Sequence, residues 1–524
     1  MITKKGYTKG MNPYIAYISF FMILLFTLYT IIAPEHSSGT IDRTRTFITL
    51  YANVWYVVLG GLFFIFCLAI AISPYGKIKL GDDDETPEYS YFAWFAMLYA
   101  AGQGIGIIFW SIAEPMFHFA SGTPFSEATA KTAEAANDAM TVTFFHWGLN
   151  AWGIYCIVAL ALAFFTYRMK KPFSIRYTLY PLLGKMVEGW LGTLIDIIAV
   201  FATIFGIATS LGLGVQQINA GLNAVWGVPQ NVTTQLLLIS VISACALLSV
   251  ISGVGRGIKY MSIANMWLTI ILLLFFIVLG PTLYIIKLFF TSSFSYLIEF
   301  IPMNLFVEGT EQSFSDPESS WKGLWQGWWT VFYWGWWMSW APFVGVFVAR
   351  VSRGRTIREF VIGVAGVSSI LSFVWLAAYG GTALYSDLMN GTDIAGIVQN
   401  NVADALYATI DSMNLGSIGT VASAVGTLLV ATYFITSSDS GTLVIATIMS
   451  EGEEHPLYRH RVFWGVMEGM LASVLLVVGG NAALSTLQTA SIAAALPFSV
   501  IMLLMCVALI KGLHQEHRRM SAPV

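Results

Sequence analysis

The sequence predicts an all-α protein that crosses a membrane many times. Hydrophobic residues make up 57% of the 524 residues and charged residues only 10%, whereas soluble domains carry about 25% charged residues. The apolar residues gather in runs of about 20, the length that an α-helix needs to span a bilayer. Lys and Arg gather on alternate connections between these runs, the asymmetry that orients membrane proteins. Together these observations predict a polytopic protein with twelve transmembrane helices.

Twelve apolar runs are long enough to be membrane spans. They cover approximately residues 13–33, 52–74, 90–112, 141–167, 192–224, 234–254, 261–289, 326–349, 359–383, 417–449, 462–480 and 484–510. The first run is too long for a signal-peptide core and lacks a small-residue cleavage site. We therefore expect it to remain as a helix.

The distribution of positive charge predicts the orientation. With a cytoplasmic N-terminus, only five of the 26 Lys and Arg lie outside, namely Arg43, Arg45, Lys131, Lys287 and Lys322. Cytoplasmic connections are normally the positive ones, so both termini are expected inside.

The four cysteines all lie in apolar runs, which predicts neither disulfides nor a cysteine metal site. No basic stretch is typical of a nucleic-acid partner.

The first two spans have no interior charge and are expected to be peripheral helices. The third span carries the stretch Ala100-Ala101-Gly102-Gln103-Gly104-Ile105-Gly106 at its middle. Alternate glycines favour unwinding, which is tolerated at membrane depth only where the backbone is buried or lines a cavity. Unwound backbone offers N–H groups to an anion and carbonyls to a cation. Close helix packing through small residues is the alternative, and Gln103 among the glycines favours a functional site.

The fourth span begins with an aromatic patch that contains Trp147, Trp152 and Tyr155. Trp152 and Tyr155 are three residues apart and share a helical face. His146 precedes them and has two interpretations, a proton relay or a structural hydrogen-bonding residue. Asp196, inside the fifth span, has no explanation from the sequence.

The eighth span is the richest in tryptophan. Eight of the 18 tryptophans fall between Trp321 and Trp340. Trp334, Trp337 and Trp340 share a helical face, and Trp336 lies one step around it. Ring faces in such a group form a box for a cation that has no N–H to donate. Aromatic packing between helices is the alternative.

The tenth span carries consecutive polar residues, Thr436-Ser437-Ser438-Asp439-Ser440, after Tyr433. Polar groups are costly inside a membrane, so they are taken as a functional site by default. Hydroxyl and carbonyl oxygens are ligands that suit Na⁺. We therefore predict a cation site on this helix.

The chain divides into an N-terminal segment with two peripheral helices (1–89), two units of five spans (90–289 and 326–510), an outer loop (290–325) and a short cytoplasmic tail (511–524). The third span runs from inside to outside and the eighth from outside to inside. The two units therefore have opposite orientations, the topology of an inverted repeat.

Three motifs in these segments resemble the betaine, choline and carnitine transporter family of secondary carriers. They are the run from Trp329 to Trp337, the run from Ala349 to Thr356, and the glycine stretch 102–106. The resemblance extends from about residue 13 to residue 510. It implies a LeuT-like core of two inverted five-helix repeats, formed by helices 3–7 and 8–12. It also implies a homotrimer in the cell membrane, which is the inner membrane in a cell that has two membranes.

The resemblance also implies site residues. The central aromatic box corresponds to Trp147, Trp152, Tyr155 and Trp337. Trp336 and Trp340 match aromatics on the inward path, and Gly102, Gly104 and Gly106 match the substrate-binding backbone. The sodium site corresponds to the backbone of Ala100 and Gln103 and the hydroxyls of Thr436 and Ser437, near Tyr433. A second sodium site corresponds to Phe343 and hydroxyls of the fifth span.

Gly104 disfavours choline as the substrate, because choline-transporting members of the family tend to have an acidic residue at this position. We expect a zwitterion with its own carboxylate, glycine betaine or its sulfonium analogue dimethylsulfoniopropionate, imported by Na⁺ symport without a cofactor. The alternative is a Na⁺-independent carnitine or betaine exchanger, because Lys259 lies where such members place a positive charge. An enzyme is disfavoured, because only the scattered residues Glu114, His146 and Asp439 are available for chemistry.

Overall fold

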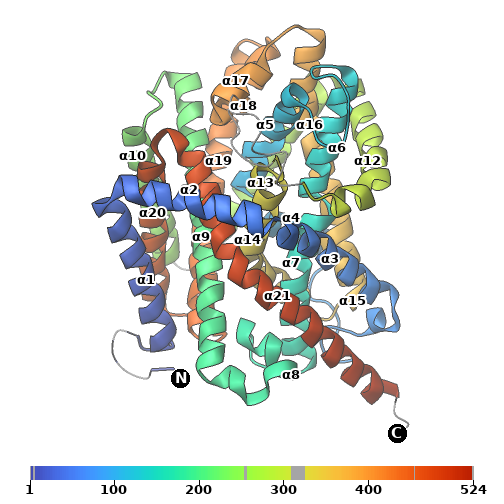
Figure 1. The fold of residues 1–524 in the computed structure, drawn as a ribbon, viewed down its shortest axis with the longest axis vertical. Coiled ribbons are helices and arrows are strands. Elements are labelled where there is room, and N and C mark those ends of the chain that lie inside the picture. Colours follow the sequence, from blue (N-terminus) through green and yellow to red (C-terminus); the bar gives the residue numbers. More distant parts are fainter. Residues whose placement is uncertain are drawn as a thin grey trace.

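The computed structural model is a bundle of α-helices, most of which run along the long axis of the molecule (Figure 1). It describes residues 2–521, apart from 4, 5, 7, 253–256, 309–324 and 454. Those described residues contain no β-strand, only two isolated bridges, Thr3 with Lys9 and Lys79 with Thr356. The predicted all-α class is therefore confirmed.

Twenty-one α-helices are distinguished in the described part of the chain. The first twelve are α1 (Pro13–Ile32), α2 (Pro34–Tyr51), α3 (Asn53–Ile72), α4 (Tyr91–Gly102), α5 (Ile105–Ser121), α6 (Ala133–Trp147), α7 (Leu149–Ala163), α8 (Tyr180–Leu183), α9 (Trp190–Trp226), α10 (Val232–Ser252), α11 (Gly257–Leu279) and α12 (Thr282–Leu305). The others are α13 (Trp325–Trp328), α14 (Thr330–Val351), α15 (Ile357–Val361), α16 (Ser368–Met389), α17 (Ile394–Asn400), α18 (Ala405–Ser412), α19 (Ser417–Met449), α20 (Tyr458–Gly479) and α21 (Ala483–Ser521).

Within the described residues, ten helical segments are long and apolar enough to cross a membrane. Nine of them coincide with predicted spans, and the tenth is α12. The remaining predicted spans correspond to the pair α4 and α5, to α11 and to α14, which are not among the ten. The chain is a multi-pass membrane protein, and the count of twelve crossings stays a prediction.

Two connections differ from the sequence analysis. The predicted span 261–289 ends at Leu279, because Gly280 and Pro281 interrupt the helix. Residues 290–305, expected in a loop, form the second part of α12. The acidic residues Glu311, Asp316 and Glu318, further along the expected loop, lie outside the described residues.

The central helix is α14 (Figure 1), and nearly all of its residues are buried. It packs against α7 and α9 of the first unit and against α21 of the second. The long helices α9 and α19 pack against each other, and α5 packs against α6, α9 and α16. The two predicted units therefore meet at the tryptophan-rich helix.

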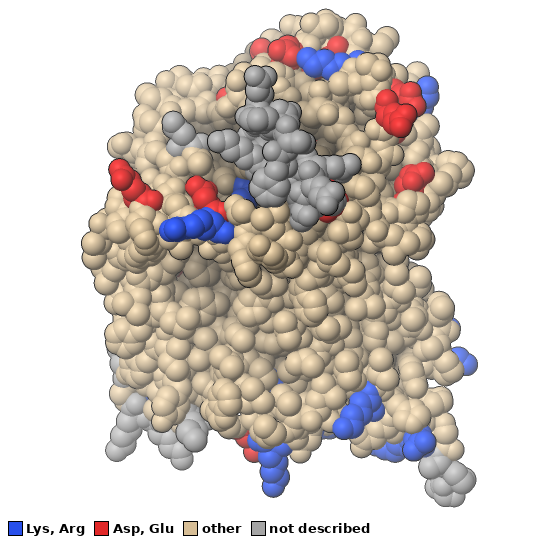
Figure 2. Space-filling view, in the orientation of Figure 1, with Lys and Arg blue, Asp and Glu red and all other residues tan. Residues whose placement is uncertain are grey.

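On the face seen in Figure 2, charged side chains lie toward the two ends of the molecule. Figure 2 shows a broad uncharged band between them, and Lys and Arg gather at the end where both termini lie in Figure 1. The buried Asp196 pairs with Arg176, whose Nε lies 2.6 Å from Asp196 Oδ2. This ion pair explains the aspartate that the sequence left unexplained.

Candidate functional site

The third predicted span is interrupted where its glycines lie. Helix α4 ends at Gly102 and α5 begins at Ile105. Gln103 between them is extended (φ −114°, ψ 153°), and Gly104 is also non-helical (φ −170°, ψ −136°). The predicted unwinding is confirmed. It leaves the first backbone N–H groups of α5 without helical partners, as at any helix N-terminus.

Two of the three glycines of this stretch, Gly102 and Gly106, allow aromatic rings to approach the backbone. A Cβ added to Gly102 would lie 2.4 Å from the Trp152 ring, and one added to Gly106 would lie 2.5 Å from the Trp336 ring. A Cβ on Gly104 would meet Trp340 and Ser437 Oγ only at 3.6 Å. Side chains at 102 and 106 would therefore displace a ring, whereas position 104 has room for one.

The four residues of the predicted aromatic box form one continuous group of buried rings. The Trp147 and Trp337 centroids are 4.8 Å apart, with their planes at 69°. Tyr155 lies 6.0 Å from Trp337 and 5.8 Å from Trp152, again edge to face. Each of the four side chains is at most 3% exposed. We call these four residues the aromatic box.

Hydrogen bonds hold the edges of the three indoles in the box. Trp337 Nε1 donates to the His146 carbonyl oxygen (3.0 Å), and Trp152 Nε1 donates to Ser372 Oγ (3.4 Å). Trp147 Nε1 donates to Glu114 Oε2 (2.7 Å). The buried Tyr155 hydroxyl has no hydrogen-bond partner among the described residues. The N–H edges are thus engaged within the protein, whereas the ring faces are not used by these bonds.

Two further tryptophans extend the box along α14. Trp336 stacks on Trp337 at 4.9 Å, with the planes at 13°, and its Nε1 donates to Ser210 Oγ (3.2 Å). Trp340 lies 6.5 Å from Trp336, and its Nε1 donates to the Gly206 carbonyl (2.9 Å). Both rings are therefore fixed against the small-residue face of α9.

The predicted sodium residues are only partly brought together. Ser437 on α19 lies beside Gly104, so α19 contacts the break. Thr436 is turned toward α11, where Asn265 Nδ2 donates to its hydroxyl (3.0 Å). The Tyr433 hydroxyl also bonds to α11, through Thr269 Oγ1 (2.9 Å).

The remaining predicted ion ligands lie on either side of the break. Gln103 is in the break itself, and Ala100 lies in α4, about one turn before it. Phe343, predicted near a second sodium site, packs against Trp340 at 5.4 Å. In α9, the Thr203 hydroxyl donates to the Ala199 carbonyl of its own helix (2.8 Å).

Glu114 and His146, which are far apart in the sequence, lie together in the structure. Glu114 Oε1 is 2.6 Å from His146 Nδ1 and 3.5 Å from His118 Nε2, and all three side chains are buried. Carboxylate and imidazole groups are zinc ligands, and these atoms lie within 4.8 Å of one another. However, the Glu114 oxygens are already engaged by His146 and by Trp147 Nε1. The arrangement is therefore a hydrogen-bonded network.

One polar residue near the break was missed from the sequence. Ser372 on α16 accepts hydrogen bonds from both Gln103 Nε2 (3.0 Å) and Trp152 Nε1. Its own hydroxyl donates to the Ser368 carbonyl (3.0 Å). Two serines four residues apart in an apolar helix share a face, and this spacing was a signal that the sequence offered.

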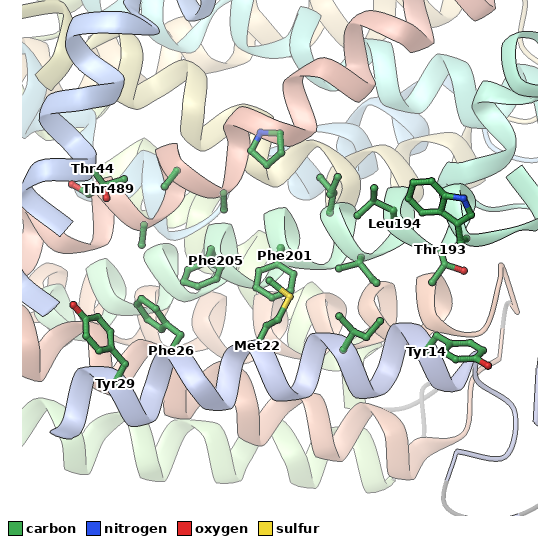
Figure 3. Close-up of a pocket in the computed structure, with 18 of the residues that line it drawn as sticks. Tyr14, Met22, Phe26, Tyr29, Thr44, Thr193, Leu194, Phe201, Phe205 and Thr489 are labelled. Carbon is green, nitrogen blue, oxygen red and sulfur yellow. The ribbon is translucent and has the colours of Figure 1, made fainter. Parts of the chain in front are cut away.

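A separate apolar groove of about 880 Å³ lies between α1, α2, α9 and α21 (Figure 3). Tyr14, Met22, Phe26 and Tyr29 from α1 face Phe201 and Phe205 from α9 across it. The described residues that line the groove include no residue of the aromatic box and no Lys or Arg. The groove is therefore distinct from the aromatic box.

Comparisons with the sequences of known proteins indicate one family. Residues 14–518 match the model described as "BCCT, betaine/carnitine/choline family transporter". The probable glycine betaine transporter of Desulfitobacterium hafniense is 44% identical over 512 residues, which cover 98% of this chain and 99% of the relative. The glycine betaine transporter OpuD of Bacillus subtilis is 43% identical, covering 94% and 93%. Glycine betaine transporter 1 of Vibrio parahaemolyticus is 41% identical, covering 96% and 93%.

Proposed function

Because the chain belongs to the betaine/carnitine/choline transporter family, we propose that it imports a zwitterion with a methylated onium head. Glycine betaine is the first candidate, because several relatives of nearly the same length are named as its transporters. Dimethylsulfoniopropionate is the second, because it combines a methylated sulfonium head with a carboxylate. The relatives are transporters, which also favours a carrier over an enzyme.

The observation that supports this proposal most is the aromatic box. A quaternary ammonium or sulfonium group has no N–H to donate, so its recognition depends on ring faces. Cation–π contacts contribute about 0.5–2 kcal/mol each. Four rings therefore supply several of the roughly 8 kcal/mol that micromolar affinity requires.

The substrate carboxylate has a natural partner in the helix break. The N-terminus of α5, at Ile105, presents backbone N–H groups and the positive end of the helix dipole. Gly102 and Gly106 bring this backbone against Trp152 and Trp336. We therefore place the onium head in the box and the carboxylate at the start of α5.

Sodium is proposed as the coupling ion. Backbone carbonyls of Ala100 and Gln103, with the hydroxyls of Thr436 and Ser437, would supply its oxygen ligands, and Thr436 would turn from Asn265 to do so. Sodium bound at the break would stabilise the backbone conformation that receives the carboxylate. We also propose that both termini are cytoplasmic. The membrane potential contributes about 2.3 kcal/mol to uptake for each positive charge that moves inward across 100 mV.

The test is uptake by proteoliposomes that contain the purified protein. Radiolabelled glycine betaine, dimethylsulfoniopropionate, carnitine and choline are compared with and without an inward sodium gradient. We expect sodium-dependent accumulation of glycine betaine above its external concentration and little uptake of choline. If uptake is the same with and without the sodium gradient and requires substrate inside the vesicles, the protein is an exchanger.

A further inference from the structure

A buried carboxyl group lies directly behind the aromatic box. Glu114 is on α5, three turns beyond the helix break, and its side chain is fully buried. Its Oε2 accepts the hydrogen bond from Trp147 Nε1 at 2.7 Å. Trp147 in turn packs edge to face against Trp337, in the box. The Glu114 carboxyl group thus contacts Trp147, a residue of the proposed binding site, from outside that site.

The other oxygen of this carboxyl group is fixed by a chain of polar contacts. Glu114 Oε1 lies 2.6 Å from His146 Nδ1, and His146 Nε2 lies 3.1 Å from Thr330 Oγ1. The His146 ring also stacks on Tyr333, with centroids 4.8 Å apart and planes at 25°. Helices α6 and α14 therefore hold Glu114 from one side, and Oε2 is directed at Trp147.

The Trp147 indole N–H is buried, so it needs a hydrogen-bond acceptor inside the protein. Trp147 is the last residue of α6, and Gly148 after it is non-helical (φ −95°, ψ −135°). An indole N–H buried without an acceptor costs roughly 1–3 kcal/mol. A ring at the end of a helix would turn to avoid that cost, and its face would no longer be presented to the onium group.

We propose that Glu114 is a positioning residue for substrate binding: it holds the Trp147 ring in the orientation that contacts the onium head, and His146 holds Glu114. This inference rests on the proposed function of the aromatic box. The carboxyl group acts as a hydrogen-bond acceptor at a fixed place, and it does not contact the substrate.

The test uses near-isosteric replacements of Glu114 in the full-length protein. In Glu114→Gln the amide oxygen still accepts the Trp147 N–H, whereas Glu114→Met has no comparable acceptor. Calorimetric titration with glycine betaine in sodium buffer gives the Kd of each variant. We expect Glu114→Met to raise Kd at least tenfold and Glu114→Gln to stay within threefold of wild type. Glu114→Leu is the second variant should the methionine protein not fold.

A double-mutant cycle separates this role from a general structural one. Trp147→Phe removes the indole N–H, so in that background Glu114→Met should change Kd by less than threefold. Trp55→Phe is the matched control, because Trp55 Nε1 donates to Ser499 Oγ (2.7 Å) outside the box. If Glu114→Met raised Kd equally in the Trp147→Phe and Trp55→Phe backgrounds, the positioning role of Glu114 would be wrong. The positioning role would also be wrong if Glu114→Gln raised Kd as much as Glu114→Met. Binding would then depend on the charge or the proton of the carboxyl group and not on its acceptor oxygen.

A second measurement does not depend on the substrate. In protein labelled with ¹⁵N-tryptophan, the Trp147 indole N–H signal is assigned by its absence in Trp147→Phe. We expect its hydrogen exchange to be slow in wild type and Glu114→Gln and clearly faster in Glu114→Met. Unchanged exchange in Glu114→Met would contradict the positioning role even where betaine does not bind. A wild-type protein that fails to bind betaine would contradict the proposed function instead.

Discussion

Among single residues, Trp337 packs against two other rings of the aromatic box. Replacing Trp337 by Leu removes the ring that touches both Trp147 and Tyr155. We expect a loss of about 2 kcal/mol in substrate binding, which corresponds to a rise of roughly 30-fold in the KM for betaine uptake. Uptake kinetics normalised to the amount of protein in the membrane measure this. Trp55→Leu, outside the box, should leave KM within threefold, and a normal KM in Trp337→Leu would refute the box.

The glycines of the break give a matched pair of substitutions. Gly102→Ala places a methyl group 2.4 Å from the Trp152 ring and must displace it, whereas Gly104→Ala meets its neighbours at 3.6 Å. We expect Gly102→Ala to raise the KM for betaine at least tenfold and Gly104→Ala to raise it less than threefold. Uptake kinetics of the two variants test this order, and a larger effect at position 104 would contradict the geometry.

The four box residues could be named in advance only because the family resemblance implied them. The hydrogen bonds that hold their indole N–H groups could not be predicted from the sequence. The contact of Glu114 with Trp147 depends on the rotation of α5 relative to α6, and the contact of Trp152 with Ser372 depends on the position of α16. These are tertiary relations, which helical periodicity within one segment does not define.

At the scale of helices, the proposed sodium site lies where the α4–α5 break meets α19. Ser437→Ala removes the hydroxyl nearest to Gly104. Loss of one ligand oxygen should cost roughly 1–3 kcal/mol, so we expect the half-saturating sodium concentration for uptake to rise about tenfold. Ser473→Ala on α20, whose hydroxyl bonds its own helix, is the control. An unchanged sodium dependence in Ser437→Ala would exclude this serine as a ligand.

Long apolar helices were predicted well, and the shorter or polar ones were not. The predicted span 417–449 coincides with α19 (Ser417–Met449), and 192–224 lies within α9 (Trp190–Trp226). Helix α2 was missed because its sequence is largely polar, and in Figure 1 it lies across the bundle. Hydropathy identifies segments that cross a bilayer, and α2 does not have that composition.

At the scale of the whole molecule, buried ion pairs tie distant parts of the chain together at the end that holds both termini. Arg168, just after α7, pairs with Glu516 near the end of α21 at 2.6 Å, and both side chains are nearly fully buried. Arg168 also bonds Asp83, and this contact lowers the pKa of the Asp83 carboxyl. The last helix is therefore anchored to the first unit.

Removing one partner of this pair should destabilise the protein. Glu516→Ala leaves the Arg168 guanidinium buried without one of its carboxylates, at a cost of about 3 kcal/mol. We expect a lower thermal unfolding temperature in detergent with little change in the Kd for betaine. Arg519→Ala is the control, because Arg519 pairs with the same carboxylate at 2.7 Å but its side chain is 69% exposed. Equal unfolding temperatures for Glu516→Ala and wild type would contradict the role of this pair.

The proposed function depends on recognition of the substrate's positive charge by the aromatic box. The most direct measurement compares, by calorimetry in sodium buffer, the binding of glycine betaine and of 3,3-dimethylbutanoate. The latter has the same shape and carboxylate but a carbon in place of the ammonium nitrogen. Four cation–π contacts at about 0.5–2 kcal/mol each predict that glycine betaine binds at least about 30-fold more tightly. Equal affinities would show that the rings select shape alone and do not recognise the positive charge.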